Sequence, residues 1–91
     1  MKDILNERGS RYGSFIDNAR TTHFLKEQVR NSPSWSKMYA DQREALDMIC
    51  HKIARIVNGD PDYADSWVDI AGYATLVAER LENDSARRNQ M

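Results

Sequence analysis

The chain has 91 residues, of which 41% are hydrophobic and 30% charged, and its formal net charge is −1. This length and composition are typical of one folded domain and exclude a disordered chain. Because the charge is close to balanced, it provides no general attraction to nucleic acid, and we expect no nucleic-acid partner. A chain this short buries a small core, so we expect a homo-oligomer that completes it.

The sequence contains no segment that is typical of export or of a membrane protein. Its first residues lack the apolar stretch of a signal peptide, and no run approaches the ~20 apolar residues of a membrane span. The single cysteine, Cys50, lies among Met48, Ile49 and Ile53, which favours a buried thiol over a metal ligand. We therefore expect a cytoplasmic protein without a membrane partner.

Glycine and proline residues divide the first half of the chain into predicted helices. Residues 2–8 form a short predicted helix before Gly9, and residues 14–31 form a longer one with Ser14 as its N-cap. Residues 34–40, after Pro33, are predicted as a loop or a single helical turn. On the longer helix, one face carries Phe15, Ala19, Thr22 and Val29.

The clearest helical pattern covers residues 42–57. Asp41 is its predicted N-cap, with Glu44 as the capping-box partner, and Asn58-Gly59 is the predicted stop. Apolar residues at helical spacing are expected to face the core; they are Leu46, Ile49, Cys50, Ile53 and Val57.

A last predicted helix runs over Asp62–Leu81, opening after Pro61. Its apolar stripe consists of Trp67, Ile70, Ala74, Val77 and Leu81. The short link to the preceding helix predicts an antiparallel hairpin, and no segment alternates like a strand. We expect an all-α bundle of three to four helices, with one domain over residues 1–82 and a frayed polar tail over 83–91.

Carboxylates follow the helical spacing on the last two predicted helices. Residues three or four apart share a side, which groups Glu44 with Asp47 and Asp65 with Asp69. In an antiparallel hairpin the two acidic margins would face one cleft. Mg²⁺ prefers oxygen ligands and bridges to phosphates, so these four residues are a candidate magnesium site.

A structural explanation exists beside the metal hypothesis. Acidic residues in a first helical turn interact favourably with the helix dipole, which accounts for Glu44 and Asp65. Asp47 and Asp69 lie inside helices, where Asp is a poor helix former, and both could form ion pairs. His51 is a further candidate ligand or base, although a lone His is more often structural.

Basic and aromatic residues supply candidate nucleotide contacts. Lys52 and Arg55 lie on the polar side of the helix over 42–57, where they could hold a phosphate or simply face solvent. Arg11 and Tyr12 precede a helix N-terminus, a position that suits an anion and a stacked base.

Two blocks of the sequence carry a resemblance to a known family. Lys52–Ile56 followed by Asp65–Ala74, together with Tyr12-Gly13 and Asn18, resembles a family of small phage and prophage proteins over about residues 10–82. That family is similar to the MazG-like all-α nucleoside triphosphate pyrophosphohydrolases. Their Glu-x-x-Glu and Glu-x-x-Asp pairs bind Mg²⁺, and they assemble as dimers or tetramers.

The resemblance implies a role for each matched carboxylate. Glu44 and Asp47 correspond to the first pair, and Asp69 corresponds to the end of the second. The residue three before Asp69 is Ser66, and Asp65 lies one position too early, a rotation of about 100° around a helix.

Several functions follow as alternatives from these patterns. One is a Mg²⁺-dependent nucleotide pyrophosphohydrolase. A second is a non-catalytic anti-defence sponge that sequesters a nucleotide immune signal in the cytoplasm of an infected host. A third is a module that binds a host protein through Trp35, Met38 and Tyr39, which could equally form a subunit interface.

Overall fold

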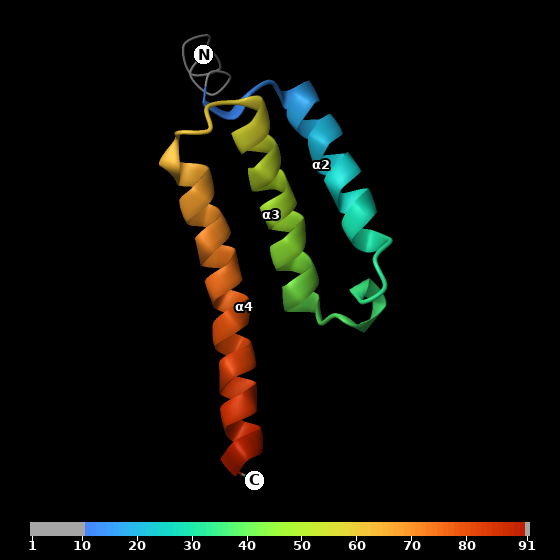
Figure 1. Cartoon of the computed structure of the whole chain (residues 1–91), viewed down its shortest axis with the longest axis vertical. Helices are drawn as coiled ribbons and strands as arrows, with labels where there is room; N and C mark the ends of the chain where they lie inside the picture. The colour runs from blue at the N-terminus through green and yellow to red at the C-terminus, as the bar shows by residue number, and fades with distance from the viewer. Residues whose placement is uncertain (1–10, 91) are drawn as a thin grey trace.

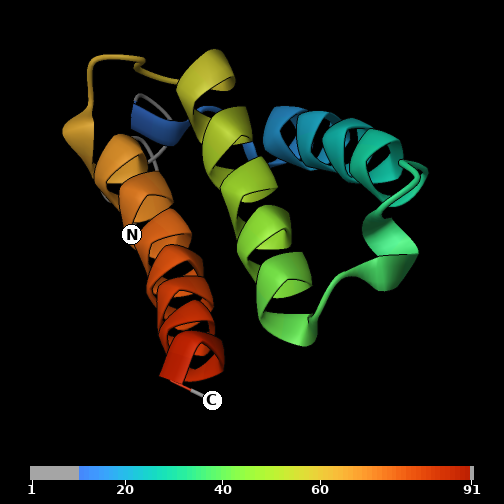
Figure 2. The ribbon, with the colours of Figure 1, turned by 60° about the horizontal axis from the view of Figure 1, so that its bottom comes forward.

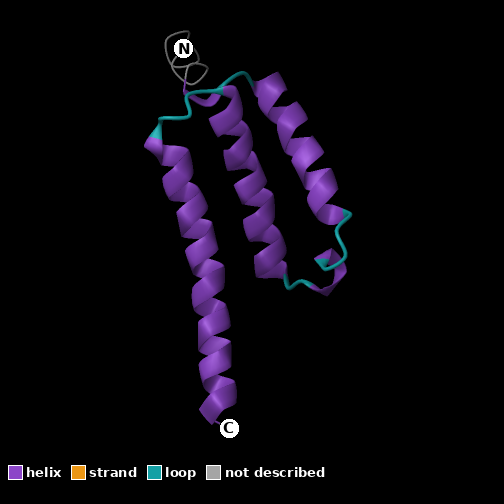
Figure 3. Cartoon of the chain, in the orientation of Figure 1, coloured by secondary structure: helices purple, strands orange, loops and turns teal. Residues whose placement is uncertain are grey.

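A computed structural model describes residues 11–90, with side chains described as far as Ser85. These residues form helix α2 (Phe15–Arg30), the 3₁₀ turn η1 (Trp35–Lys37), helix α3 (Ala40–Asn58) and helix α4 (Ala64–Gln90). No strand occurs within this range, as Figure 3 shows. The all-α prediction is therefore confirmed, while the predicted helix over residues 2–8 lies outside the described part.

Helix α2 and the segment after it match their predicted positions. The hydroxyl of Ser14, the N-cap, accepts a hydrogen bond from the backbone N–H of Asp17 at 3.1 Å. This contact satisfies one of the N–H groups that every helix start leaves without a partner. The predicted loop or single turn after Pro33 contains η1.

The predicted start of α3 is wrong by two residues. The helix begins at Ala40 after the N-cap Tyr39, and the side-chain oxygen of Gln42 accepts from the Tyr39 backbone N–H at 2.8 Å. Gln42 thus takes the position expected for Glu44. Asp41, the predicted cap, instead accepts from the Arg80 guanidinium at 2.7 Å, and Arg80 holds the pKa of that carboxyl below its usual value.

Both predicted ends of α4 also need correction. The helix starts at Ala64 and not at Asp62, because Pro61 and Asp62 lie in a turn where the Asp60 carboxylate accepts from the Asp62 N–H at 3.0 Å. It continues to Gln90, so most of the tail expected to fray is helical. An ion pair between Arg80 and Asp84, four residues apart at 3.1 Å, supports this extension.

The three helices lie side by side in one layer with α3 in the middle (Figure 1), and α3 keeps this place in the rotated view (Figure 2). α3 packs against both α2 and α4. It runs antiparallel to each, which confirms the predicted hairpin. The molecule measures 57 × 26 × 21 Å, with a radius of gyration of 16.2 Å. A compact domain of 100 residues has a radius of about 13 Å, so this chain is extended.

The packed interior is small. The buried apolar residues of the described part are Ala45, Cys50 and Ala54, joined by the polar Thr22 and Ser66. Cys50 confirms the predicted buried thiol. The predicted core stripe of α3 is otherwise only partly covered, and Val57 is 63% exposed. No helix between residues 11 and 90 is long and apolar enough to cross a membrane.

Two glycines, Gly13 and Gly59, allow the chain before α2 to pass close to the end of α3. Gly13 has a φ of +83°, which favours glycine, and a Cβ there would lie 2.5 Å from the carbonyl oxygen of Asn58. The Arg11 carbonyl accepts from the Asp60 N–H at 2.9 Å. This crossing fixes Arg11 and Tyr12 beside the link between α3 and α4.

Candidate functional site

A cleft between α2 and α3 brings together basic side chains from both helices. It has a volume of about 240 Å³, and Lys26 and His23 from α2 line it together with His51 and Arg55 from α3. The other lining residues are Phe15, Asn18, Ala19 and Thr22. No carboxylate of the described residues lines this cleft. It therefore presents a surface of positive potential with polar and apolar walls.

The pKa of His51 is consistent with this positive potential. Burial lowers its pKa from the ordinary value, and the nearby charges of Lys26 and Arg55 lower it further. Asp47 acts in the opposite direction but is outweighed. Two cations that disfavour a third positive charge create a site where a bound anion is stabilised. The neutral imidazole can also accept a proton when that anion arrives.

Arg55 links the cleft to a cluster of aromatic and charged groups at the end of α3. Its guanidinium lies 4.9 Å from the centre of the Tyr12 ring, and that of Arg11 lies 4.6 Å from the centre of the Tyr63 ring. The two rings are tilted, with centres 5.6 Å apart. The cation–π contact with Tyr12 holds the Arg55 guanidinium, and a contact of this kind leaves N–H groups in the guanidinium plane able to bind an anion.

Tyr12 is fixed from several directions. Its hydroxyl donates to the Asp65 carboxylate at 3.0 Å, and its carbonyl accepts from the Asn18 amide at 2.6 Å. Burial, followed by the contacts with Asp65 and Tyr63, raises the pKa of Tyr12 to about 12. The hydroxyl therefore stays protonated at neutral pH and keeps donating to Asp65. Asp65 thus acts here as the acceptor that positions Tyr12, which in turn supports Arg55.

Three of the four candidate nucleotide residues come together in this region, and Lys52 does not. Arg11, Tyr12 and Arg55 surround the end of α3 beside the cleft. Lys52 turns toward α4, where its ammonium group pairs with the Asp69 carboxylate at 2.9 Å. The Lys52 side chain is only 12% exposed, so it is positioned by that pair.

The four candidate metal ligands face different neighbours. Asp47 pairs with Arg30 of α2 at 3.3 Å, and Asp69 pairs with Lys52 on the other side of α3. Glu44 lines a shallow apolar depression against Tyr73 of α4, while Asp65 accepts from Tyr12. The two acidic margins therefore do not share a cleft.

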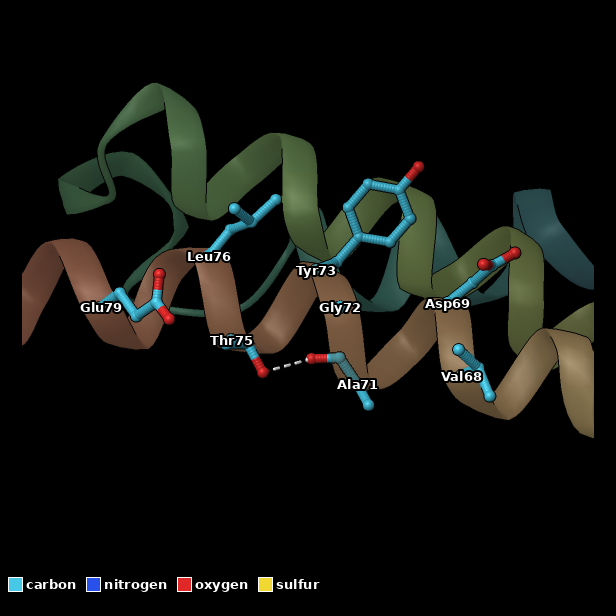
Figure 4. Close-up of a pocket in the computed structure, with 8 residues that line it drawn as sticks. All are labelled: Val68, Asp69, Ala71, Gly72, Tyr73, Thr75, Leu76 and Glu79. Atoms are coloured by element: carbon cyan, nitrogen blue, oxygen red, sulfur yellow. Dashed lines mark hydrogen bonds between the residues drawn. The ribbon is translucent and has the colours of Figure 1, made fainter.

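Asp69 also borders an open depression of about 660 Å³ on the surface of α4. Figure 4 shows Asp69, Tyr73 and Leu76 on the side of α4 that faces α3, whereas Val68 and Ala71 point away. The charged groups that line the depression are the carboxylates Asp69 and Glu79. An anionic ligand would be repelled there, in contrast to the cleft between α2 and α3.

The donor set does not fit a magnesium centre within one chain over residues 11–90. No three acidic, histidine or cysteine side chains of this part come close enough to hold a metal ion together. Asp47, Asp65 and Asp69 each already contact a cation or a hydroxyl from another segment. Magnesium binding by Glu44, Asp47, Asp65 and Asp69 thus stays a prediction from the sequence.

Some residues of the cleft were not candidates from the sequence. His23 and Phe15 line the cleft but carry no motif. Tyr63, which contacts Arg11 and Tyr12 beside the cleft, lies in a link between helices. One usable signal was the spacing of His51 and Arg55, which places both on one side of α3, beside a helix whose Ala19 and Thr22 permit close approach. The partner helix supplies the rest, which a single helix pattern does not reveal.

The fold and the cleft together define a small helical protein with a basic cleft between two of its helices. Residues 1–81 match a family described as a domain of unknown function, DUF6378, and the chain belongs to this family. Comparison with curated proteins gave no match, and comparison with solved structures gave none either. The family description names no ligand or reaction, so the chemistry of the cleft is the guide to function.

Proposed function

We propose that this protein binds a nucleotide or a related phosphorylated small molecule, with a phosphate group in the cleft between α2 and α3. The observation that carries this proposal is the lining of the cleft, in which Lys26, His23, His51 and Arg55 converge without a carboxylate. Lys and Arg side chains form short, charge-assisted hydrogen bonds with phosphate oxygens. The guanidinium of Arg55 is additionally held by the Tyr12 ring, so less conformational freedom is lost on binding.

The size of the cleft indicates which part of the ligand it holds. Pockets that enclose a drug-sized molecule measure about 300–1,000 Å³, and this cleft measures about 240 Å³. It suits a phosphate or diphosphate group and not a whole nucleotide. The base and ribose would extend over Phe15, whose ring is 86% exposed at the edge of the cleft. Exposed aromatic rings stack well on nucleobases.

Binding without turnover is the form of this function that the arrangement of side chains supports best. Three of the four candidate metal ligands already have partners: Asp47 pairs with Arg30, Asp69 with Lys52, and Asp65 accepts from Tyr12. We therefore favour sequestration of a nucleotide, the anti-defence sponge of a phage-type protein, over Mg²⁺-dependent hydrolysis. In the MazG-like alternative, the same phosphate contacts would serve a pyrophosphohydrolase.

The test measures binding by isothermal titration calorimetry with inorganic pyrophosphate, ATP and adenosine, each with and without Mg²⁺. Pyrophosphate and ATP are expected to bind and adenosine alone is not. The substitutions Lys26→Ala and Arg55→Ala should weaken binding by roughly 10- to 100-fold, the equivalent of one charge-assisted hydrogen bond. The matched control is Lys37→Ala, because Lys37 is exposed in η1, away from the cleft.

Recovery of the ligand separates the two forms of the proposal. The ATP complex is denatured and its nucleotide analysed by chromatography. Intact ATP after incubation with Mg²⁺ supports sequestration, whereas release of pyrophosphate supports hydrolysis. If neither pyrophosphate nor ATP binds, or if Lys37→Ala weakens binding as much as Lys26→Ala, the cleft is not a phosphate site.

A further inference from the structure

The layer of helices has two different faces, which the positions along α3 define. Glu44, His51 and Arg55 lie on one side of this helix at spacings of seven and four residues. Each of these positions is followed two residues later by an apolar residue, which lies about 200° further around the helix. These apolar residues are Leu46, Ile53 and Val57. The first face carries the basic cleft. The second, which we call the apolar face, is directed away from it.

Helix α4 contributes to the apolar face as well. A groove of about 360 Å³ runs between α3 and α4, and Leu46, Ile49, Ala74, Val77 and Leu81 line it. Gln42 supplies a polar side chain to it, and no charged side chain of the described residues lines it. At its end lies Met38, which follows η1. The apolar stripes expected to form the core thus border an open groove on one side of the layer.

Large apolar side chains on this side of the layer are uncovered within one chain. Val57 is 63% exposed, Trp67 54% and Leu81 38%. Stable domains are built from two or more packed layers around a core, and this chain supplies one layer whose buried apolar residues are small.

We propose that a second copy of this chain covers the apolar face, so that two layers stack with their grooves against each other. Two-fold symmetry places the same surface of both copies in contact. Because no charged side chain of the described residues lines the groove, two such grooves can contact each other without repulsion between like charges. Val57 continues the apolar stripe of α3, and Trp67 belongs to the apolar stripe of α4. They are 63% and 54% exposed in one chain, and both become buried in the pair.

This arrangement assigns an orientation to the two ligand sites. Because the basic cleft and the apolar face lie on opposite sides of α3, stacking through the apolar face leaves both clefts on the outer surfaces of the pair. The interface therefore does not depend on the ligand. An experiment that disproves the interface between two copies therefore leaves the phosphate proposal untouched, and the reverse also holds.

The test determines the mass of the full chain in solution by sedimentation velocity over a range of concentrations. We expect twice the monomer mass of 10.5 kDa for the unmodified chain. Val57→Glu should raise the dissociation constant of the pair about 100-fold or more, because two-fold symmetry buries the new charge twice. Val57 is largely exposed in one chain, so this substitution leaves the fold of the monomer intact, which circular dichroism checks.

Two matched controls carry the same change on other exposed apolar positions. Leu76→Glu alters the part of α4 that borders the depression with Asp69, outside the apolar groove. Phe24→Glu alters an exposed position on α2; Leu76 and Phe24 are 66% and 62% exposed. Both are expected to leave the mass of the pair unchanged. A monomeric unmodified chain would overturn the proposal. So would a pair that dissociates with Leu76→Glu or Phe24→Glu and persists with Val57→Glu.

Discussion

Replacing Gly59 by alanine tests how the chain before α2 is held against the end of α3. A Cβ at this position would lie 2.6 Å from the carbonyl carbon of Tyr12, and its other close neighbours are backbone atoms of Arg11. Ordinary van der Waals contact begins at 3.4 Å, and an Arg11 backbone atom lies closer than the Tyr12 carbon, so the segment with Arg11 and Tyr12 has to move by at least about 0.8 Å. A flexible side chain could relieve such a contact by changing its rotamer, but backbone atoms cannot.

The cost follows from the contacts that this movement breaks. The hydrogen bonds from Asp60 to the Arg11 carbonyl, 2.9 Å, and from Asn18 to the Tyr12 carbonyl, 2.6 Å, share the displaced segment. Each contributes about 1 kcal/mol, and the Arg55–Tyr12 contact about 0.5–1 kcal/mol. Alanine recovers about 0.4–1 kcal/mol by restricting the unfolded chain. We expect a net loss of about 2 kcal/mol in the free energy of unfolding.

Urea denaturation followed by circular dichroism at one fixed protein concentration measures this loss. With a slope of about 1–2 kcal/mol per molar for a small domain, the midpoint should fall by about 1–2 M. Gly72→Ala is the matched control: nothing lies within 4 Å of its added Cβ, and alanine is favoured inside a helix by about 0.5–1 kcal/mol. Its midpoint should rise. A Gly59→Ala midpoint equal to or above that of the unmodified chain would refute the reasoning.

Three further predictions concern single side chains. Burial and the charges of Lys26 and Arg55 lower the pKa of His51, so a bound anion should make His51 take up a proton. Sulfate, which does not titrate in this range, should therefore bind more tightly at pH 5.5 than at pH 8. Calorimetry should find that sulfate affinity depends less on pH in His51→Gln. Without a ligand the same lowered pKa means that the unfolded state binds more protons, so stability should fall as the pH drops below about 6.5. Cys50 is 4% exposed, and burial raises the pKa of its thiol; a disulfide reagent should label it at least about 100-fold more slowly in buffer than in urea, and equal rates would contradict the buried position. Asp47→Asn removes a pair in which the Arg30 side chain is 51% exposed, so the free energy of unfolding should change by less than about 1 kcal/mol; a loss above 2 kcal/mol would show that Asp47 has a larger structural role.

The helices themselves could be predicted from local residues. Ser14, Pro33 and Gly59 act within a turn of their own position, and the structure has helix boundaries near each of them. The boundaries that were wrong depend on contacts from elsewhere. Asp41 has the side chain of an N-cap, but Arg80 of α4 binds it, which a local pattern does not contain.

The candidate site was predictable only in part, for a similar reason. Helical spacing put Arg55 on the side of α3 that lines the cleft, but it gave no information about which helix lies opposite. His23 and Lys26 reach the cleft because α2 packs beside α3. The same limitation affects the carboxylates. Asp47 and Asp69 are inside helices as expected, yet each finds a cation on a different neighbour.

The apolar stripes connect the fold to both proposals. A stripe on α3 that faced α2 or α4 directly would have been covered within one chain, but Leu46, Ile53 and Val57 point to a side of the layer that the neighbouring helices cover only in part. The helices instead meet through Ala45, Cys50 and Ala54, together with Thr22 and Ser66. These small side chains allow close approach of the backbones, which brings Lys26 and His51 to the walls of one narrow cleft. In the proposed pair the apolar residues meet those of a second copy, while the small residues shape the cleft that we propose as the phosphate site.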